Sequence, residues 1–155
     1  MKRFLIVLVI LICATSLALA AGPEGDQAKD PKGFRDYLWG TSLETLSNKE
    51  VIFFSSKIKA TDGKNIEVYA DVRMKDKGLI SLYAFAEKKL VAGTFTIALG
   101  SKEKFLGVVK ELWGEPTSTK DGDLFWNFRT TRIVARTSLR VFEITLSDRS
   151  FMEEI

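Results

Sequence analysis

The sequence predicts a single α+β domain built on an antiparallel sheet of about seven strands with two helices. Short segments of alternating or β-branched apolar residues recur between turn-forming residues over positions 51–99. The segment 102–113 changes to the spacing of an amphipathic helix, and alternation returns after residue 123. The expected order is therefore a four-strand meander, a helix and a three-strand meander, spanning residues 34–150.

The first 20 residues have the three parts of a secretory signal peptide. Lys2 and Arg3 give a cationic start, residues 4–13 form an unbroken apolar run, and residues 18–20 form an A-x-A cleavage motif, with a second cleavage position after Ala21. The run is too short for a retained membrane anchor, and Leu-Ile before Cys13 does not fit a lipid-attachment motif. We therefore expect export to the periplasm or beyond the cell, with no membrane span after cleavage.

Export changes the composition of the mature chain. Cleavage after Ala20 leaves 135 of the 155 residues, with 21 Lys and Arg against 20 Asp and Glu. The single cysteine leaves with the signal peptide, and the chain has no histidine. Disulfides, Cys-His pairs, Ser-His-Asp triads and histidine-ligated metals are thereby excluded. The near-neutral charge gives no reason to expect nucleic acid as a partner, and no cofactor is expected.

The start of the mature chain is expected to be irregular. Residues 21–33 carry three glycines, two prolines and no large apolar side chain, which predicts a flexible leader. A short helix is expected over 42–48, with Thr41 as its N-cap and Glu44 reaching back to complete a capping box. Leu43 and Leu46 are expected to face the core.

The first meander begins with a β-branched and aromatic strand over 51–58, followed by an Asp-Gly pair that predicts a hairpin. In the next strand, 65–74, even-numbered residues are expected to face the core and odd-numbered residues to face water. Strand 79–86 is apolar at both parities, which predicts cover on both faces, and strand 90–99 follows. The even-numbered set is Ile66, Val68, Ala70, Val72 and Met74, and the odd-numbered set is Asn65, Glu67, Tyr69, Asp71 and Arg73.

The helix predicted over 102–113 has clear boundaries. Ser101 is a plausible N-cap, Gly114 suits a left-handed helix end, and Pro116 prevents continuation. The residues that follow the helical spacing, and are expected to face the core, are Phe105, Val108, Val109 and Leu112.

The last three strands are expected to pair through loops at 129–132 and 136–139. That register gathers the apolar residues on the core face, and a shift by one residue would turn them outward. The expected cross-strand pairs are Phe128–Ile133, Trp126–Ala135, Ala135–Arg140 and Ile133–Phe142.

Three local motifs resemble chemical sites. Ser101–Lys104 matches the S-x-x-K nucleophile motif of penicillin-recognising enzymes, but the other motifs of those enzymes are missing, and an N-cap is the simpler reading. Residues 121–123 (Asp-Gly-Asp) lack the further ligands of a calcium loop and read as a turn. Glu67 and Asp71 are the candidate pair for a carboxylate-based hydrolase, which would need no histidine.

The strongest candidate surface is the outer face of the last three strands, where four arginines and no acidic residue occur over positions 124–141. Arginine planes beside exposed apolar groups suit anionic or amphipathic partners. The alternative is a solvated face on which Arg132 pairs with Glu143 across the hairpin. The predicted contact residues, whose apolar members are expected to be exposed, are Phe125, Arg129, Arg132, Val134, Arg136 and Val141.

Several motifs recur together across residues 34–147. They are Phe34 followed by Trp39-Gly40-Thr41-Ser42, the strand 82–85 with Leu90, the helix end Trp113-Gly114-Glu115-Pro116, and Phe125-Trp126. The pattern resembles a loose group of small exported bacterial proteins with a WG-x-S start and a (Y/W)-G-x-P helix end, and this resemblance implies no activity or catalytic residue. A more distant likeness is to BamE-type accessory proteins of outer-membrane assembly, which also pair a helix ending in G-x-P with an antiparallel sheet. The chain departs from those proteins by lacking a lipid-attachment motif and by its extra N-terminal strands.

Together these features predict an exported, non-enzymatic binding or accessory protein of the bacterial cell envelope. The expected partner is an envelope protein or an anionic or amphipathic ligand that contacts the arginine-bearing face. Two alternatives stay open: a carrier that holds a small ligand in a cavity between the sheet and the helices, and a hydrolase that uses carboxylates or a Ser-Lys pair.

Overall fold

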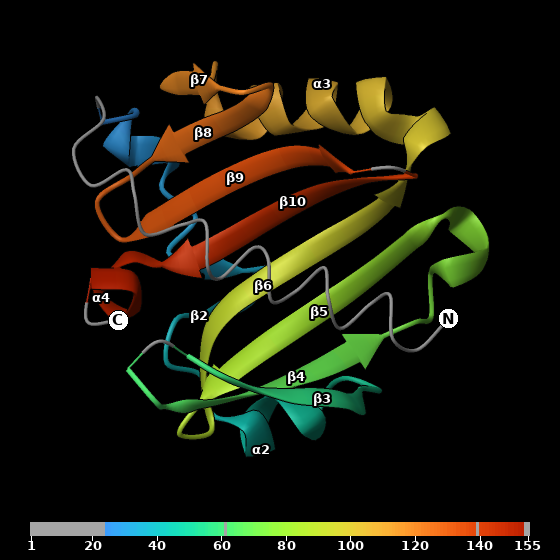
Figure 1. The fold of residues 1–155 in the computed structure, drawn as a ribbon, viewed down its shortest axis with the longest axis vertical. Coiled ribbons are helices and arrows are strands. Elements are labelled where there is room, and N and C mark those ends of the chain that lie inside the picture. The colour runs from blue at the N-terminus through green and yellow to red at the C-terminus, as the bar shows by residue number, and fades with distance from the viewer. Residues whose placement is uncertain (1–23, 61, 139, 154–155) are drawn as a thin grey trace.

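An eight-stranded antiparallel sheet forms the body of the computed structural model, which describes residues 24–60, 62–138 and 140–153. The strand order is β3-β4-β5-β6-β10-β9-β8-β7, and β1 and β2 form a separate two-stranded sheet (Figure 1). Within the described residues there are three α-helices, of which only one is long. The α+β class is confirmed, with one strand more in the main sheet than expected. The predicted signal peptide and its cleavage sites lie outside the described residues.

The first four strands of the main sheet form the predicted meander. They are β3 (Phe53–Lys59), β4 (Asn65–Asp71), β5 (Leu79–Ala86) and β6 (Lys89–Ala98), and each pairs with the next along the chain. β5 is buried at both parities, as its apolar composition predicts. Between β4 and β5 a short 3-10 helix, η3 (Lys75–Lys77), ends at Gly78, whose φ of 74° suits glycine.

The N-terminal elements include a hairpin that the sequence pattern does not predict. They are η2 (Gln27–Lys29), β1 (Gly33–Phe34), β2 (Tyr37–Leu38) and the short helix α2 (Leu43–Ser47). The N-cap of α2 is Ser42 rather than Thr41, because the Thr41 hydroxyl donates to the Leu38 carbonyl while the Ser42 hydroxyl accepts from the Thr45 amide. Strands of two residues are too short to leave a readable alternation, so β1 and β2 carry no sequence signal.

The long helix is α3 (Lys102–Trp113), which follows η4 (Leu99–Ser101) and occupies the predicted range. Its buried side differs from the prediction. Val109 is buried and Phe105, Leu106 and Trp113 pack against the main core, whereas Val108 and Leu112 are 46% and 58% exposed. The helix carries two adjacent apolar stripes. The sheet packs against the stripe that contains Val109 and Trp113, and the stripe that contains Val108 and Leu112 stays exposed. Ser101 stands at the N-cap without a side-chain capping bond.

The last strands keep their predicted faces but not their predicted register. They are β7 (Ser118–Lys120), β8 (Asp123–Asn127), β9 (Thr131–Ser138) and β10 (Val141–Asp148), followed by the short helix α4 (Arg149–Glu153). The four cross-strand pairs predicted above are wrong, because Trp126 pairs with Ile133, and Ala135 pairs with Ile144. The register differs by an even number of residues, which leaves every side chain on its expected face. Alternation alone could not distinguish these registers.

The two faces of the main sheet are built differently. α3, α2 and the β1–β2 hairpin pack on one face, and side chains such as Trp126, Phe34 and Tyr83 form the main core there. We term the opposite face the outer face; β2 passes behind β6 in Figure 1, so this face of the central strands is toward the viewer. The outer face carries a second buried apolar cluster, whose members are Ile58, Ile66, Val68, Ala70 and Leu82.

This second cluster corrects the division expected for β4. Ile66, Val68 and Ala70 share one face as predicted, but that face is the outer one, and Val72 and Met74 are exposed beyond the end of the strand. Tyr69 and Asp71, expected to face water, instead point toward the main core and the N-terminal hairpin. The alternation predicts which side chains of β4 share a face. It does not predict which elements pack on that face, because both faces of this sheet carry buried side chains.

The motifs behind the family resemblance have structural roles. The indole nitrogen of Trp39 donates to the Thr131 hydroxyl at 2.9 Å, which fastens the segment after β2 to β9. The indole nitrogen of Trp126 donates to the Gly114 carbonyl at 2.8 Å, which fastens the end of α3 to β8. Gly114, with a φ of 81°, adopts backbone geometry that L side chains rarely reach.

Gly93 leaves the space in which the N-terminal hairpin packs against the sheet. The Phe34 ring is fully buried, lies over Gly93 in β6, and contacts Tyr83 edge-on with ring centroids 5.2 Å apart. A Cβ at position 93 would overlap the Phe34 ring, whereas a Cβ at Gly100 would meet open space. β6 therefore needs a residue without a side chain at this point.

We expect Gly93→Ala to destabilise the protein by about 2 kcal/mol, because Phe34 must move out of a packed core. Urea unfolding would measure the change, with Gly100→Ala as the matched control, for which we expect a change within about 0.5 kcal/mol. Equal stability of the two variants would contradict the role assigned to Gly93.

Candidate functional site

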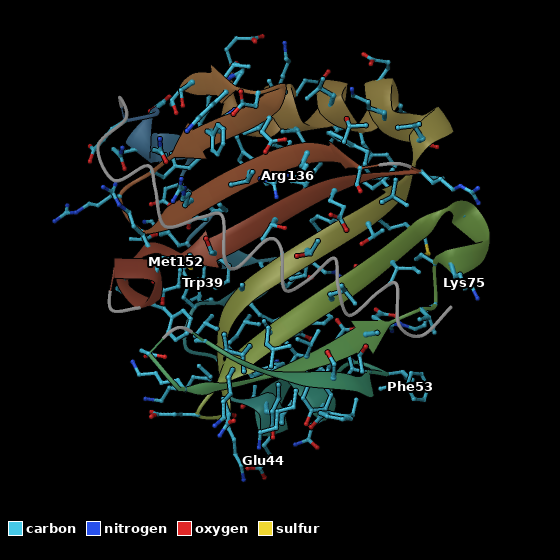
Figure 2. All side chains as sticks on the ribbon, in the orientation of Figure 1. Trp39, Glu44, Phe53, Lys75, Arg136 and Met152 are labelled. Carbon is cyan, nitrogen blue, oxygen red and sulfur yellow. The ribbon has the colours of Figure 1, made fainter. Side chains whose placement is uncertain are left out.

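The predicted arginine-bearing surface forms on the outer face of β8, β9 and β10. Phe125 pairs with Val134, and Arg136 pairs with Glu143, so these side chains point to the same side. Figure 2 labels Arg136 on this side of β9. We term the following set the arginine face: Phe125, Arg132, Val134, Arg136 and Val141.

Arg129 is the sixth predicted contact residue, and it lies beside the arginine face. It is exposed in the turn between β8 and β9, where its backbone amide donates to the Gln27 side chain at 2.6 Å. The described part of the expected leader contacts the same turn, because Asp30 accepts hydrogen bonds from the Thr130 amide and hydroxyl.

The apolar members of the arginine face are more covered than expected. Phe125 is 7% exposed, which corrects the expectation of an exposed ring, and Val134 and Val141 are half-buried. The Arg132 guanidinium lies 5.8 Å from the centroid of the Phe125 ring, in range of a cation–π interaction. Burial, with Arg149 nearby, lowers the pKa of Arg132. The site therefore holds a desolvated arginine on an aromatic base.

Arg136 is held by a carboxylate that sequence reasoning did not include. Its Nε and Nη2 atoms lie 2.7 and 2.6 Å from Oδ2 of Asp123. The alternative prediction of an Arg132–Glu143 pair is wrong, since Arg132 stands opposite Ser147 and Arg136 stands opposite Glu143. Asp123 lies directly before the segment 124–141, which has no acidic residue. Only the register between β8 and β9 shows that its carboxylate reaches Arg136.

Glu143 is the unusual residue of this site. Its side chain is 2% exposed on β10, between Arg136 of β9 and Thr96 of β6. Burial raises the pKa of Glu143 to about 7, against the opposing effects of the Arg136 charge and a hydrogen bond from Thr96. Among the described residues, no group donates a hydrogen bond to its Oε2 atom. Buried polar atoms in folded proteins almost always have a partner, so this carboxyl marks a place that the described residues leave incomplete.

The arginine face is continuous with the second apolar cluster. One row of paired residues runs across the sheet from Leu82 through Thr94 and Thr145 to Val134, with the two threonine hydroxyls 3.0 Å apart. Four strand spacings of about 4.8 Å separate β4 from β9, or about 19 Å in all. The outer face thus changes from apolar to hydroxyl-bearing to arginine-bearing along a length that suits an amphipathic molecule.

A second polar cluster on the opposite face joins the N-terminal hairpin to the sheet. Nη1 of Arg35 lies 3.1 Å from Asp71 and 2.6 Å from the Tyr83 hydroxyl, and Arg73 contacts both Asp71 and Glu50. Hydrogen bonds from Arg73, aided by Arg35, lower the pKa of Asp71 to about 2. Burial raises the pKa of Tyr83 to about 12.

The carboxylates proposed for a hydrolase do not converge. Glu67 and Asp71 lie four residues apart on one strand face, a separation of about 13 Å, whereas glycosidase carboxylates lie about 5–9.5 Å apart. Glu67 lies 4.0 Å from Lys57, and Asp71 is held by two arginines. This geometry gives no support to acid–base chemistry by the pair.

The Asp-Gly-Asp segment at 121–123 has a structural role, as the sequence predicts. Asp121 and Gly122 have positive φ and form the turn between β7 and β8. Within the described part of the chain, no group of three or more Asp, Glu, Cys or His residues could hold a metal ion. In the same residues, no helix has the length and apolarity needed to cross a membrane.

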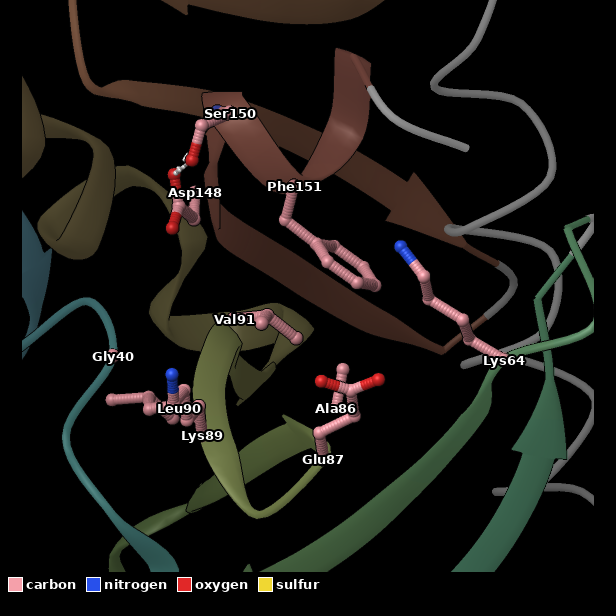
Figure 3. Close-up of a pocket in the computed structure, with 10 residues that line it drawn as sticks. All are labelled: Gly40, Lys64, Ala86, Glu87, Lys89, Leu90, Val91, Asp148, Ser150 and Phe151. Atoms are coloured by element: carbon pink, nitrogen blue, oxygen red, sulfur yellow. Dashed lines mark hydrogen bonds between the residues drawn. The ribbon is translucent and has the colours of Figure 1, made fainter.

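An open cleft of about 280 Å³ lies at the β5–β6 turn. It is bordered by Phe151 of α4, the side chains of Lys64 and Glu87, and the segment at Gly40 (Figure 3). This location is at the end of the sheet and differs from the cavity between sheet and helices expected for a small-ligand carrier. The cleft is slightly smaller than common ligand pockets.

Comparison of the chain with protein-family models, with curated proteins and with solved structures gave no significant match. The fold and the arrangement of its side chains are therefore the basis for the function proposed below.

We expect the stability of the protein to fall at acidic pH through Asp71. Its pKa is lowered from 3.8 to about 2 in the folded state, so its contribution is present above pH 3.8 and is lost as the pH falls toward 2. Asp71→Asn should cost about 2 kcal/mol at pH 7, and the deficit should shrink below pH 3.8. Urea unfolding over this pH range would measure it. Asp36→Asn, in the exposed β1–β2 turn, is the control, and a deficit that is constant with pH would contradict the assignment.

Glu143 should give the opposite pH dependence. Its folded-state pKa of about 7 lies above its ordinary value of 4.5, so the folded protein keeps a proton that the unfolded chain releases between these values. Stability should therefore decrease as the pH rises from 4.5 to 7. Glu143→Gln should flatten this part of the pH profile in urea unfolding, while Glu111→Gln on the exposed side of α3 should leave it unchanged. An unaltered slope in Glu143→Gln would contradict the shifted pKa.

Proposed function

We propose that this chain is an exported, non-enzymatic binding or accessory protein of the bacterial cell envelope, and that it binds an amphipathic partner through the arginine face. The observation that carries this proposal is the gathering of Arg132 and Arg136 with Phe125, Val134 and Val141 on one side of β8–β10, opposite the main core. Arg129, in the adjoining turn, is proposed as a contact at the rim.

The charged part of this surface supports recognition of a polar or anionic group. A guanidinium that has already been desolvated pays little further desolvation when it pairs with an anion, and its planar fork suits carboxylate and phosphate groups. Arg132, 8% exposed above the Phe125 ring, has this character.

The neighbouring apolar cluster supports an amphipathic partner over a purely ionic one. Among the described residues that pack against this cluster, Phe151 of α4 is the one that comes from beyond the region of strands β3 to β5. An apolar segment of the partner would pack beside Phe151 on the second apolar cluster, and the polar end of the partner would contact the arginines. The accessory role that the BamE-type likeness implies would use such a surface.

The cleft at the β5–β6 turn favours a second candidate function, a small-ligand carrier. Its volume of about 280 Å³ and the aromatic ring of Phe151 would suit a small organic molecule. Native mass spectrometry of the purified protein would decide this point, because a carrier should retain a ligand that Phe151→Ala releases.

Site-specific photo-crosslinking tests the proposed function. A photoreactive residue in place of Val141 should crosslink to an envelope component in living cells, and the same residue in place of Glu111 on α3 should not. Arg132→Gln combined with Arg136→Gln should reduce the Val141 crosslink by about tenfold or more, since removing central arginines from an interface typically costs at least 1–2 kcal/mol.

Arg140→Gln is the matched control, because it removes the same charge from an exposed turn at the end of β9. Thermal unfolding would show whether each variant is folded. A crosslink that is equally strong in the double variant and in Arg140→Gln would refute the arginine face as the contact surface.

A further inference from the structure

A cluster of exposed apolar side chains lies far from the arginine face, where β3 begins and β4 ends. β3 is the first strand of the main sheet, and three strands lie between it and β10. Phe53 and Phe54 are 56% and 59% exposed, although large aromatic side chains usually contribute to a core. We term this set the β3–β4 corner: Val51, Phe53, Phe54, Val72 and Met74.

The strand pairing places these residues at one end of the β3 edge. Phe53 pairs with Ala70 and points to the outer face, whereas Phe54 pairs with Tyr69 and points to the opposite face. Val72 follows directly beside the start of β3. Glu50 directly precedes Val51 in the sequence, and Arg73 directly follows Val72. These two charged residues form an ion pair that holds the two segments together. Figure 2 shows the labelled side chains of Phe53 and Lys75 projecting from the same side of the molecule.

Basic residues surround the corner. The segments 49–59 and 71–78 contain six Lys and Arg but only three Asp and Glu, although the expected mature chain is almost neutral. Of these acids, Asp71 and Glu50 are engaged by Arg35 and Arg73. The lysines of the two segments are all exposed, and they are Lys49, Lys57, Lys59, Lys75 and Lys77.

We propose that the β3–β4 corner docks the protein on the surface of an anionic lipid membrane. The apolar and aromatic side chains of the corner enter the interfacial region of the bilayer, and the surrounding lysines contact the anionic head groups. Exposed apolar residues within a basic rim are the combination that this type of peripheral binding requires, because burial of apolar area and attraction of charge add.

Pairing of β3 with a second copy of the chain is the less favoured use of this edge. A bulge between Phe54 and Ser56 interrupts the ladder, and Lys57 and Lys59 lie along the same strand. Bulges and lysines are the features that natural edge strands use against edge-to-edge pairing. Two copies would also bring the basic residues of both corners together, whereas an anionic surface would be attracted to them.

Quenching by brominated lipids tests the docked position. Phe54→Trp places a reporter in the corner, and Leu112→Trp places the same reporter at an exposed site of α3, where Leu112 is 58% exposed. With vesicles of phosphatidylethanolamine and brominated phosphatidylglycerol, we expect stronger quenching of the fluorescence added by Phe54→Trp than of that added by Leu112→Trp. Because the readout belongs to one position, other membrane-binding segments of the chain do not affect it.

Charge and apolarity are then varied separately. Lys75→Glu with Lys77→Glu should weaken the binding of the corner to these vesicles by about 30-fold or more, since each lysine near an anionic surface contributes about 1 kcal/mol. Lys104→Glu with Lys120→Glu, at exposed positions elsewhere, is the matched control. Phe53→Ser in the Phe54→Trp background should reduce the quenching, while Val108→Ser should not.

Several results would overturn the proposal. Equal quenching of the two reporters would do so, as would undiminished quenching with phosphatidylcholine vesicles or equal effects of the two charge reversals. A mass that doubles in solution, and returns to that of a monomer in Phe53→Ser, would assign the corner to self-association instead. The arginine variants of the crosslinking test should leave the quenching unchanged, so the two proposals can fail independently.

Discussion

The packing of the Phe34 ring on Gly93 is the contact on which the N-terminal half of the structure depends. A two-residue strand cannot hold itself against a sheet by hydrogen bonds alone. The missing side chain in β6 lets an aromatic ring reach the backbone of a central strand, where Tyr83 and Phe95 enclose it. Once the ring is seated, the next residue, Arg35, reaches both Asp71 and the Tyr83 hydroxyl.

That contact also decides how the two faces of the sheet differ. The hairpin, α2 and α3 occupy one face, and the large aromatic side chains gather there. The outer face keeps a smaller apolar cluster, a row of threonines and the arginines with Glu143. The two surfaces on which the proposals rest are the arginine face, which belongs to the outer face, and the β3–β4 corner. These two regions suit different partners, because one is a broad face with a buried carboxyl and the other is an exposed corner rich in lysine.

Alternation predicts which side chains share a face, and it did so for the candidate site. Phe125, Arg132, Val134, Arg136 and Val141 do lie together, although every predicted cross-strand pair was shifted. A shift by two or four residues preserves the faces, so burial cannot detect it. The partners of the arginines depend on that shift. For this reason the Arg136–Asp123 pair and the position of Glu143 opposite Arg136 could not be predicted, and the ring of Phe125, expected to be exposed, lies under Arg132.

Local sequence patterns are enough to predict the α+β class, the order of the strands in the first meander, the extent of the long helix and the faces of the last three strands. These properties depend on local periodicity and on turn residues, which nearby positions control. Three features follow only from the packing of distant segments: which apolar stripe of α3 is buried, the buried side chains on both faces of β4, and the exposure of Phe53 and Phe54 at a basic edge. Those outcomes depend on which elements cover each surface, and residues distant in the chain supply that cover.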